Sequence, residues 1–352
     1  MHHYHKLQEK IASHPVGAPK TEEFLEILKI LYHPDEIEIA ALLDFRLRKM
    51  SEIAGKAGIS KEDALRKLEE MANRGVLLAK KVEDEPAYAL LPNYPGLFEY
   101  PVMKGLDEPV RRRLAQLWHA YWMKDMAAEL ASANPPWNRV IPAENALPGE
   151  IEILPYEVAS QMIAKNDVIA LADCPCRVLG RNCDKPLDVC LVFDGAARFL
   201  TERGMAKVIS LEEARLVLKK SEDAALVHTG SNIADRLLFM CNCCPCCCHM
   251  LMLLTKREPP EGLAKSSYQA HFHADECIGC GICKERCPMG AFVVDDETVN
   301  FSQDKCIGCG LCISTCPTDA IILEKRKDYS PPAQNIGELI EKITTNKRMR
   351  KT

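Results

Sequence analysis

The sequence lacks the motifs by which many enzymes and exported proteins are recognised. Its 352 residues contain no phosphate-binding Walker loop, no convincing dinucleotide fingerprint and no C-x-x-x-C-x-x-C run of a radical enzyme. The first residues, Met-His-His-Tyr-His-Lys, lack the apolar stretch of a secretory signal, and no twin-arginine sequence precedes the first expected helix. These absences argue against a self-contained enzyme and predict a cytoplasmic location.

The sequence also has no large excess of positive or negative charge and no long uninterrupted apolar run. The net charge is −5, so the overall charge balance does not call for a nucleic-acid partner. The stretch 237–254 is long enough to cross a bilayer, but Asn242, Pro245, His249 and six cysteines interrupt it. We therefore expect no membrane span.

Cysteine, in contrast, is abundant. A chain expected in the cytoplasm uses 18 cysteines for metal or redox chemistry rather than for disulfides. Eight of them lie in two related runs, C-I-G-C-G-I-C-K-E-R-C-P and C-I-G-C-G-L-C-I-S-T-C-P. Each run spaces three thiolates two residues apart and places a fourth just before a proline, which is an iron–sulfur ligand pattern. Zinc sites instead pair C-x-x-C units, and the glycines allow the backbone to approach inorganic sulfide closely.

In paired runs of this kind the fourth cysteine binds the cluster of the other run. The spacing therefore predicts two 4Fe-4S clusters with exchanged outer ligands. The first set is Cys277, Cys280, Cys283 and Cys316, and the second is Cys306, Cys309, Cys312 and Cys287.

The segment from about Ala274 to Leu323 resembles the bacterial two-cluster ferredoxins, with all eight ligand positions matched. The resemblance covers roughly a seventh of the chain and implies one-electron transfer at low potential. Since exposed low-potential clusters oxidise readily, it also favours an anaerobic or microaerobic host.

The N-terminal third predicts a winged-helix order of elements. Apolar stripes over 24–31 and 37–43 are followed by a helix over 50–59, a capped helix from Ser60 to Gly75, and a hairpin over 76–91. Acidic residues offset the basic residues of the Ser60 helix, so DNA binding is possible but disfavoured against protein docking or an architectural role. The histidines near residue 1 are expected to belong to a disordered tail.

The middle of the chain alternates predicted strands and helices, which favours a small α/β domain. A long core helix over 107–131 and a proline-rich loop over 134–148 precede it. The link 229–236 is too short for a parallel crossover and predicts one antiparallel strand pair. The strands are expected at 151–154, 168–172, 207–209, 225–228 and 237–240, and the helices at 156–165, 189–203 and 211–219.

Two further cysteine groups follow the expected strands 168–172 and 237–240. If these strands run the same way, both groups meet at one edge of the sheet. Cys190 is expected in the first turn of a helix that Asp188 caps, where a thiolate is favoured. The candidate ligands are Cys174, Cys176, Cys183 and Cys190, which could form a site by themselves, and Cys241, Cys243, Cys244, Cys246, Cys247 and Cys248.

Three interpretations of these ten cysteines stay open: a third iron–sulfur cluster with ligands from both groups, zinc or another structural metal, and redox-active or merely buried thiols. Six thiols within eight residues cannot all face one metal, because neighbouring side chains of an extended chain point in opposite directions. Arg177 and His249 stand beside the groups and could tune or ligate a cluster.

Together these patterns predict an α+β multidomain protein that transfers electrons, alone or as an oxidoreductase subunit, to a redox partner protein. Acidic residues near the ferredoxin-like cysteines would suit a basic partner face. The alternatives are a redox-responsive winged-helix regulator that binds DNA, and a reductive enzyme with an open-site cluster in its middle domain. The expected parts are a winged-helix-like domain (20–100), a helical linker (101–150), an α/β cysteine-rich domain (151–265), a dicluster ferredoxin domain (266–326) and a partly disordered tail (327–352).

Overall fold

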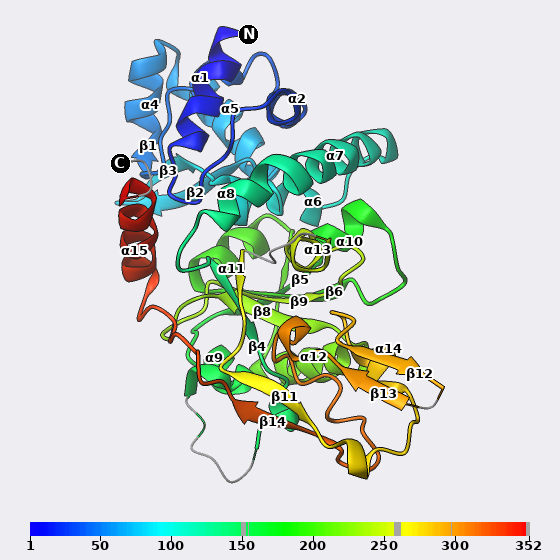
Figure 1. The fold of residues 1–352 in the computed structure, drawn as a ribbon. Coiled ribbons are helices and arrows are strands. Elements are labelled where there is room, and N and C mark those ends of the chain that lie inside the picture. The colour runs from blue at the N-terminus through cyan, green and yellow to red at the C-terminus, as the bar shows by residue number, and fades with distance from the viewer. Residues whose placement is uncertain (149–152, 154, 257–261, 297, 350–352) are drawn as a thin grey trace. The chain divides into compact units, whose positions relative to one another are not determined.

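The computed structural model describes residues 1–148, 153, 155–256, 262–296 and 298–349 (Figure 1). The chain forms two compact units, each built from several segments. Unit 1 contains Met1–Ser132, Pro175–Arg181 and Gly195–Lys207, and unit 2 contains Ala133–Cys174, Asn182–Asp194 and Val208–Thr352.

Unit 1 begins with helices and a small antiparallel sheet. From α2 onward they follow the order that the sequence predicts, with the short strand β1 in addition. Side-chain oxygens of Thr21 and Ser60 accept hydrogen bonds from the first turns of α2 and α5, and α4 ends at Gly58 in the left-handed conformation (φ 65°). The identification of these elements as a winged helix remains a prediction. They are α1 (His2–Ala12), α2 (Glu22–Leu31), α3 (Ile37–Ala40), α4 (Met50–Ala57), α5 (Lys61–Asn73), β1 (Arg48–Lys49), β2 (Leu77–Val82) and β3 (Glu85–Leu90).

The expectation of a disordered start of the chain is wrong. Residues 2–12 form α1, whose Leu7 and Ile11 are fully buried. The Tyr4 hydroxyl donates a hydrogen bond to the carbonyl of Tyr32 at 2.8 Å. The apolar side chains of Tyr4, Leu7 and Ile11 thus fix a helix whose other face carries the histidines.

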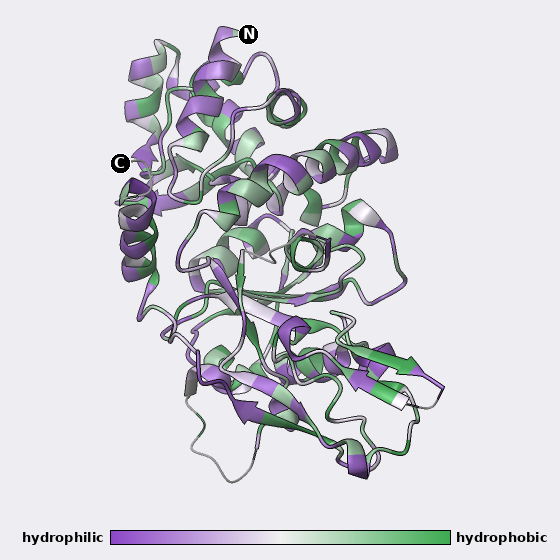
Figure 2. Cartoon of the chain, viewed as in Figure 1, coloured by the Kyte–Doolittle hydropathy of each residue, from purple (hydrophilic) through white to green (hydrophobic). Residues whose placement is uncertain are grey.

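The predicted core helix of unit 1 is present, with one irregular turn. It consists of α7 (Glu108–Tyr121), a π-helical turn η2 (Trp122–Met126) and α8 (Ala127–Ala131). Figure 2 shows polar and apolar residues side by side along α7, as an amphipathic helix requires. Trp118 and Trp122 are buried and both pack edge-on against the ring of Phe98. The remaining helical elements here are η1 (Asn93–Leu97), α6 (Tyr100–Met103), α10 (Pro175–Gly180) and α11 (Asp194–Glu202).

Unit 2 is built on a mixed sheet with the strand order β10-β4-β8-β9-β6-β5. The predicted antiparallel pair is confirmed, because β8 and β9 are joined by the short link 232–238. The strands are β4 (Asn138–Ile141), β5 (Ile169–Asp173), β6 (Asp188–Phe193), β8 (Val227–Ser231), β9 (Phe239–Cys243) and β10 (Leu263–Ala264), while β7 (Lys207–Val208) spans the boundary between the units.

Two local predictions in unit 2 are wrong. The helix expected over 189–203 begins only with α11, because the apolar run Val189 to Phe193 forms the buried strand β6, and Asp194 breaks the strand with φ 47°. The proline-rich segment 134–148 was expected as a loop but contains β4, whose four residues are all buried. The strand expected at 151–154 falls outside the described residues except for residue 153.

The helices of unit 2 cover the sheet and lead into the C-terminal region. A capping box between Ser210 and Glu213 starts α12 (Leu211–Asp223), and α9 (Ala159–Ala164) follows the 3-10 turn η4 (Pro155–Glu157). The last helix, α15 (Ile336–Met349), buries Leu339 and Ile343 completely, so this part of the tail is ordered rather than disordered. No helix in the described part of the chain is both long and apolar enough to span a bilayer.

The predicted cluster-binding region in unit 2 contains two antiparallel strand pairs, β11 with β14 and β12 with β13. An apolar strand follows each cysteine run. Its elements are β11 (Tyr268–Phe272), α14 (Ile282–Arg286), β12 (Phe292–Asp295), β13 (Thr298–Phe301) and β14 (Ile321–Lys325), and α13 (His249–Lys256) precedes them in the chain.

Candidate metal centres

Two separate cavities lie in the region of the duplicated cysteine runs. Each is lined by four cysteines and by apolar side chains, including Phe272 in the first and Phe292 in the second. The first cavity brings together Cys277, Cys280, Cys283 and Cys316; the second brings together Cys306, Cys309, Cys312 and Cys287. The chain thus brings together the same two sets of four that the spacing predicts, with the fourth cysteine of each run in the other cavity.

The local backbone supports this arrangement. The backbone N–H groups of Gly279 and Ala291 donate to the sulfurs of Cys277 and Cys287 at 3.4 and 3.3 Å. Such N–H···S bonds stabilise thiolate ligands and tune a bound cluster. Four convergent sulfurs in an apolar cavity fit the donor set of a 4Fe-4S cluster.

The two cavities differ in their surroundings. Cys280 is exposed, whereas burial raises the pKa of Cys309 to about 12 and that of Cys312 well above its ordinary value. The carbonyl of Cys309 accepts a hydrogen bond from the Ala143 N–H at 2.9 Å, which ties the second cavity to the segment after β4. Binding a metal there must displace protons from buried thiols.

Paired four-cysteine cavities with exchanged fourth residues fit an iron–sulfur site. In agreement, residues 270–323 match the family model of a 4Fe-4S dicluster domain. No curated protein and no solved structure matches the chain.

A second kind of site lies elsewhere in unit 2. The sulfurs of Cys183, Cys244, Cys246 and Cys247 all lie within 4.8 Å of one another. The Cys183 sulfur is 3.8 Å from those of Cys244 and Cys247. The Asn182 side chain fixes the loop of Cys183 by donating to the carbonyl of Cys246 at 2.9 Å. We call these four cysteines the tetrathiol site.

The geometry of the tetrathiol site matches a single tetrahedral metal. With Zn–S bonds of about 2.3 Å, the sulfurs of a tetrahedral site are about 3.8 Å apart. Two of the sulfur pairs have this separation. Among the residues that the structure describes, no other group of three or more metal-ligating side chains, the dicluster cysteines included, lies this close together.

Five other cysteines of unit 2 form a second cluster of sulfurs, which we call the inner sulfur group. It consists of Cys174, Cys190, Cys241, Cys243 and Cys248. Strand pairing places Cys190 beside Cys241, and neighbouring thiols shift the pKa values of Cys190, Cys241 and Cys243. As predicted, β5 and β9 run the same way, since both are antiparallel to β6 between them, and their cysteines meet. Cys190, however, lies in β6 and not in a helix turn.

The four cysteines Cys174, Cys176, Cys183 and Cys190 are therefore not a site by themselves. Cys183 belongs to the tetrathiol site, whereas Cys174 and Cys190 belong to the inner sulfur group. Cys176 lies in α10 of unit 1, as does Arg177. The sequence-based grouping of Cys183 with Cys174, Cys176 and Cys190 is wrong, because the loop that carries Cys183 folds toward residues 244–247.

Arginines of α5 and of its C-terminal cap in unit 1 pair with neighbouring acids. Arg66 contacts Asp63 at 2.7 Å and Glu70 at 3.3 Å, and Arg74 pairs with Glu36 at 2.5 Å. Phosphate binding depends on uncompensated positive charge. The charge pattern of this helix therefore offers no support for a DNA interface.

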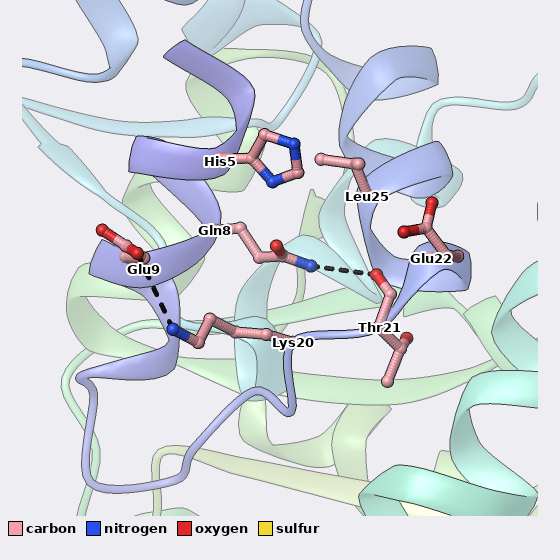
Figure 3. A pocket seen from close by; sticks show the side chains of 7 residues that line it. All are labelled: His5, Gln8, Glu9, Lys20, Thr21, Glu22 and Leu25. Atoms are coloured by element: carbon pink, nitrogen blue, oxygen red, sulfur yellow. Dashed lines mark hydrogen bonds and ion pairs between the residues drawn. The ribbon is translucent and has the colours of Figure 1, made fainter. Parts of the chain in front are cut away.

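A shallow hollow between α1 and α2 in unit 1 has mixed charge (Figure 3). Its Lys20 contacts Glu9 at 3.7 Å, and Gln8 donates to the Thr21 carbonyl at 2.9 Å. The hollow is lined by His5, Gln8, Glu9, Lys20, Thr21, Glu22 and Leu25, without a cysteine. It adds nothing to the metal centres.

Proposed function

We propose that this protein is an iron–sulfur electron carrier whose C-terminal region holds two 4Fe-4S clusters. The observation that carries the proposal is the pair of cavities, each lined by three cysteines of one run and the fourth of the other. When bound, such clusters accept and donate single electrons at low potential. The residues of the chain hold the clusters, shield them with apolar side chains and set their hydrogen bonding.

Electrons enter and leave, in this proposal, at the cavity that contains Cys280. Cys280 is exposed, and Ile278 beside it is 66% exposed, so a partner could approach this cavity closely. The cavity of Cys309 is more enclosed and hydrogen-bonded to the rest of unit 2. The first cavity thus faces the partner, and the second faces the sheet of unit 2.

The proposed partner is a redox protein with a basic docking face. Asp275, Glu276, Asp295 and Asp296 are all exposed and flank the first cysteine run or its hairpin. Opposite charges on two partners steer their encounter and make the association rate depend on salt. Glu297, expected to belong to this acidic group, is outside the described residues.

The tetrathiol site is proposed to hold one zinc ion with a structural role. Four thiolates leave no open coordination position, and such closed sites stabilise folds rather than react. The ion would join the loop of Cys183 to the chain between β9 and α13, since its ligands come from both segments. We prefer zinc to an iron–sulfur cluster at these four residues, because their sulfurs lie too close together to surround a 4Fe-4S cube.

Pairs of substitutions test the exchange of ligands between the two clusters. If Cys316 belongs with Cys280, the pair Cys280→Ser with Cys316→Ser damages one cluster, and Cys280→Ser with Cys287→Ser damages both. After anaerobic reconstitution with ferrous iron and sulfide, the first pair is expected to lose about four irons and the second about eight.

The two double variants serve as controls for each other, because each of them loses two thiols. The reverse result, with the Cys316 pair losing both clusters, would show that the ligands are not exchanged. Fewer than eight irons in the wild-type chain with all thiols intact would remove the basis of the proposed function.

A further inference from the structure

The inner sulfur group is assembled by three neighbouring strands of one sheet. The register pairs Leu191 of β6 with Met240 of β9, so Cys190 lies opposite Cys241. Cross-strand neighbours and residues two apart on one strand share a face, so Cys243 lies on the same face. Cys174 follows β5, whose Ala172 pairs with Cys190. The sheet backbone thus positions three of the five thiols. Cys174 follows the end of β5, and Cys248 lies just before α13.

The five thiols do not form a compact tetrahedron. Strand pairing places Cys190 beside Cys241, and Cys243 lies two residues further along β9. In the described part of the chain, only the tetrathiol site has three or more ligand atoms all within 4.8 Å of one another. The sulfurs of the inner group are therefore spread around a larger space than one metal ion fills, as are those of the two cluster cavities.

The number of thiols also favours a cofactor with more than one metal ion. A tetrahedral mononuclear site uses four ligands, and this group has five, with Cys174, Cys190, Cys243 and Cys248 buried. The Thr229 hydroxyl lies 3.4 Å from the sulfur of Cys243, which is the kind of hydrogen bond that tunes a thiolate ligand. Polynuclear iron–sulfur clusters are the cofactors that take several thiolates in a buried, hydrogen-bonded setting.

From these observations we infer that the inner sulfur group binds a third, polynuclear iron–sulfur cluster, separate from both the tetrathiol site and the two ferredoxin-like clusters. The inference goes beyond the proposed function and does not depend on it, because its ligands come from other strands.

A hydrogen-bonded network links this site to the dicluster region. The side-chain oxygen of Asn242, between Cys241 and Cys243, lies 2.5 Å from Nδ1 of His228, and His228 contacts Glu222 at 3.2 Å. The carbonyl of Glu222 accepts from Arg286 at 2.6 Å. Arg286 lies in α14 between two cysteines that line different cluster cavities. All of these residues belong to unit 2, so hydrogen bonds connect the inner sulfur group to the dicluster region.

Iron analysis of the full chain tests the inference. Wild-type protein reconstituted anaerobically with ferrous iron and sulfide is expected to hold about four irons beyond the eight of the dicluster region. The double variant Cys190→Ser, Cys241→Ser is expected to fall to about eight irons, about a one-third loss. Cys246→Ser, in the tetrathiol site, loses bound zinc and keeps the iron content of the wild type.

A second measurement keeps the test decisive if the double variant does not fold. The variant Cys280→Ser, Cys287→Ser, designed to lose both ferredoxin-like clusters, is expected to retain about four irons and a paramagnetic signal after reduction. Loss of all iron from this variant overturns the inference, as does a wild-type content of only eight irons. A wild-type content of eight irons leaves the proposed function intact. If the proposed function is wrong instead, iron is missing from the dicluster region alone.

Discussion

Two glycines at equivalent positions of the duplicated cysteine runs provide a matched test of the fold around the clusters. Gly281 and Gly310 both have left-handed backbones, with φ 75° and 77°. A Cβ on Gly281 would meet only Val294, at 3.9 Å. A Cβ on Gly310 would lie 2.7 Å from the Cβ of Ala146, which is much closer than real Cβ contacts. The same substitution therefore meets different surroundings in the two copies.

The expected magnitudes follow from this comparison. Alanine in the left-handed conformation costs roughly 1–2 kcal/mol in either copy. At Gly310 the overlap with Ala146 adds a packing cost of about 1–3 kcal/mol, because that side of the loop is filled by the chain after β4. Gly310→Ala is expected to be the more destabilising variant by that second amount.

The assay combines urea unfolding of the reconstituted protein with iron analysis. Gly281→Ala is expected to keep about eight irons in the dicluster region, whereas Gly310→Ala loses iron preferentially from the cavity of Cys309. Equal shifts of the unfolding midpoint in both variants would refute the packing of Gly310 against Ala146. They would also refute the contact between the loop of Cys309 and the segment after β4.

Three further predictions concern unit 2. Glu157→Gln leaves the buried Arg139 guanidinium, 3.7 Å away, without its carboxylate and should lower the free energy of unfolding by about 3–5 kcal/mol; an unchanged urea midpoint would contradict it. Arg286→Ala removes hydrogen bonds to three carbonyls and should cost about 1.5–3 kcal/mol, while the exposed Lys284→Ala should change stability by less than about 0.5 kcal/mol. Burial raises the pKa of Cys246 to about 12, so its proton must leave on metal binding. Zinc affinity, measured with a competing chelator, should therefore increase from pH 6 to pH 8, and a pH-independent affinity would exclude thiolate binding at this residue.

Local sequence signals located the secondary structure well where one strong pattern was present. The capping serine Ser60 and the apolar spacing behind it predicted α5, and the aromatic face of residues 107–131 predicted a buried helix. The strand β6 was missed because its apolar run continues directly into the helical pattern of α11, and only Asp194 separates the two. The order of α1 was missed because its few apolar residues are buried only when it packs against α2 and α3. The order of α15 was missed because only Leu339 and Ile343 of this helix are buried.

The sequence by itself determined the two sets of ferredoxin-like cysteines, since their spacing is local and a fixed backbone path around a cube requires it. It could not divide the cysteines of the middle region. Cys183 and Cys190 are seven residues apart, yet the first turns toward Cys244 and Cys247 while the second pairs across strands with Cys241. Only the tertiary structure decides this, because strand register and loop direction, not distance along the chain, determine which sulfurs meet.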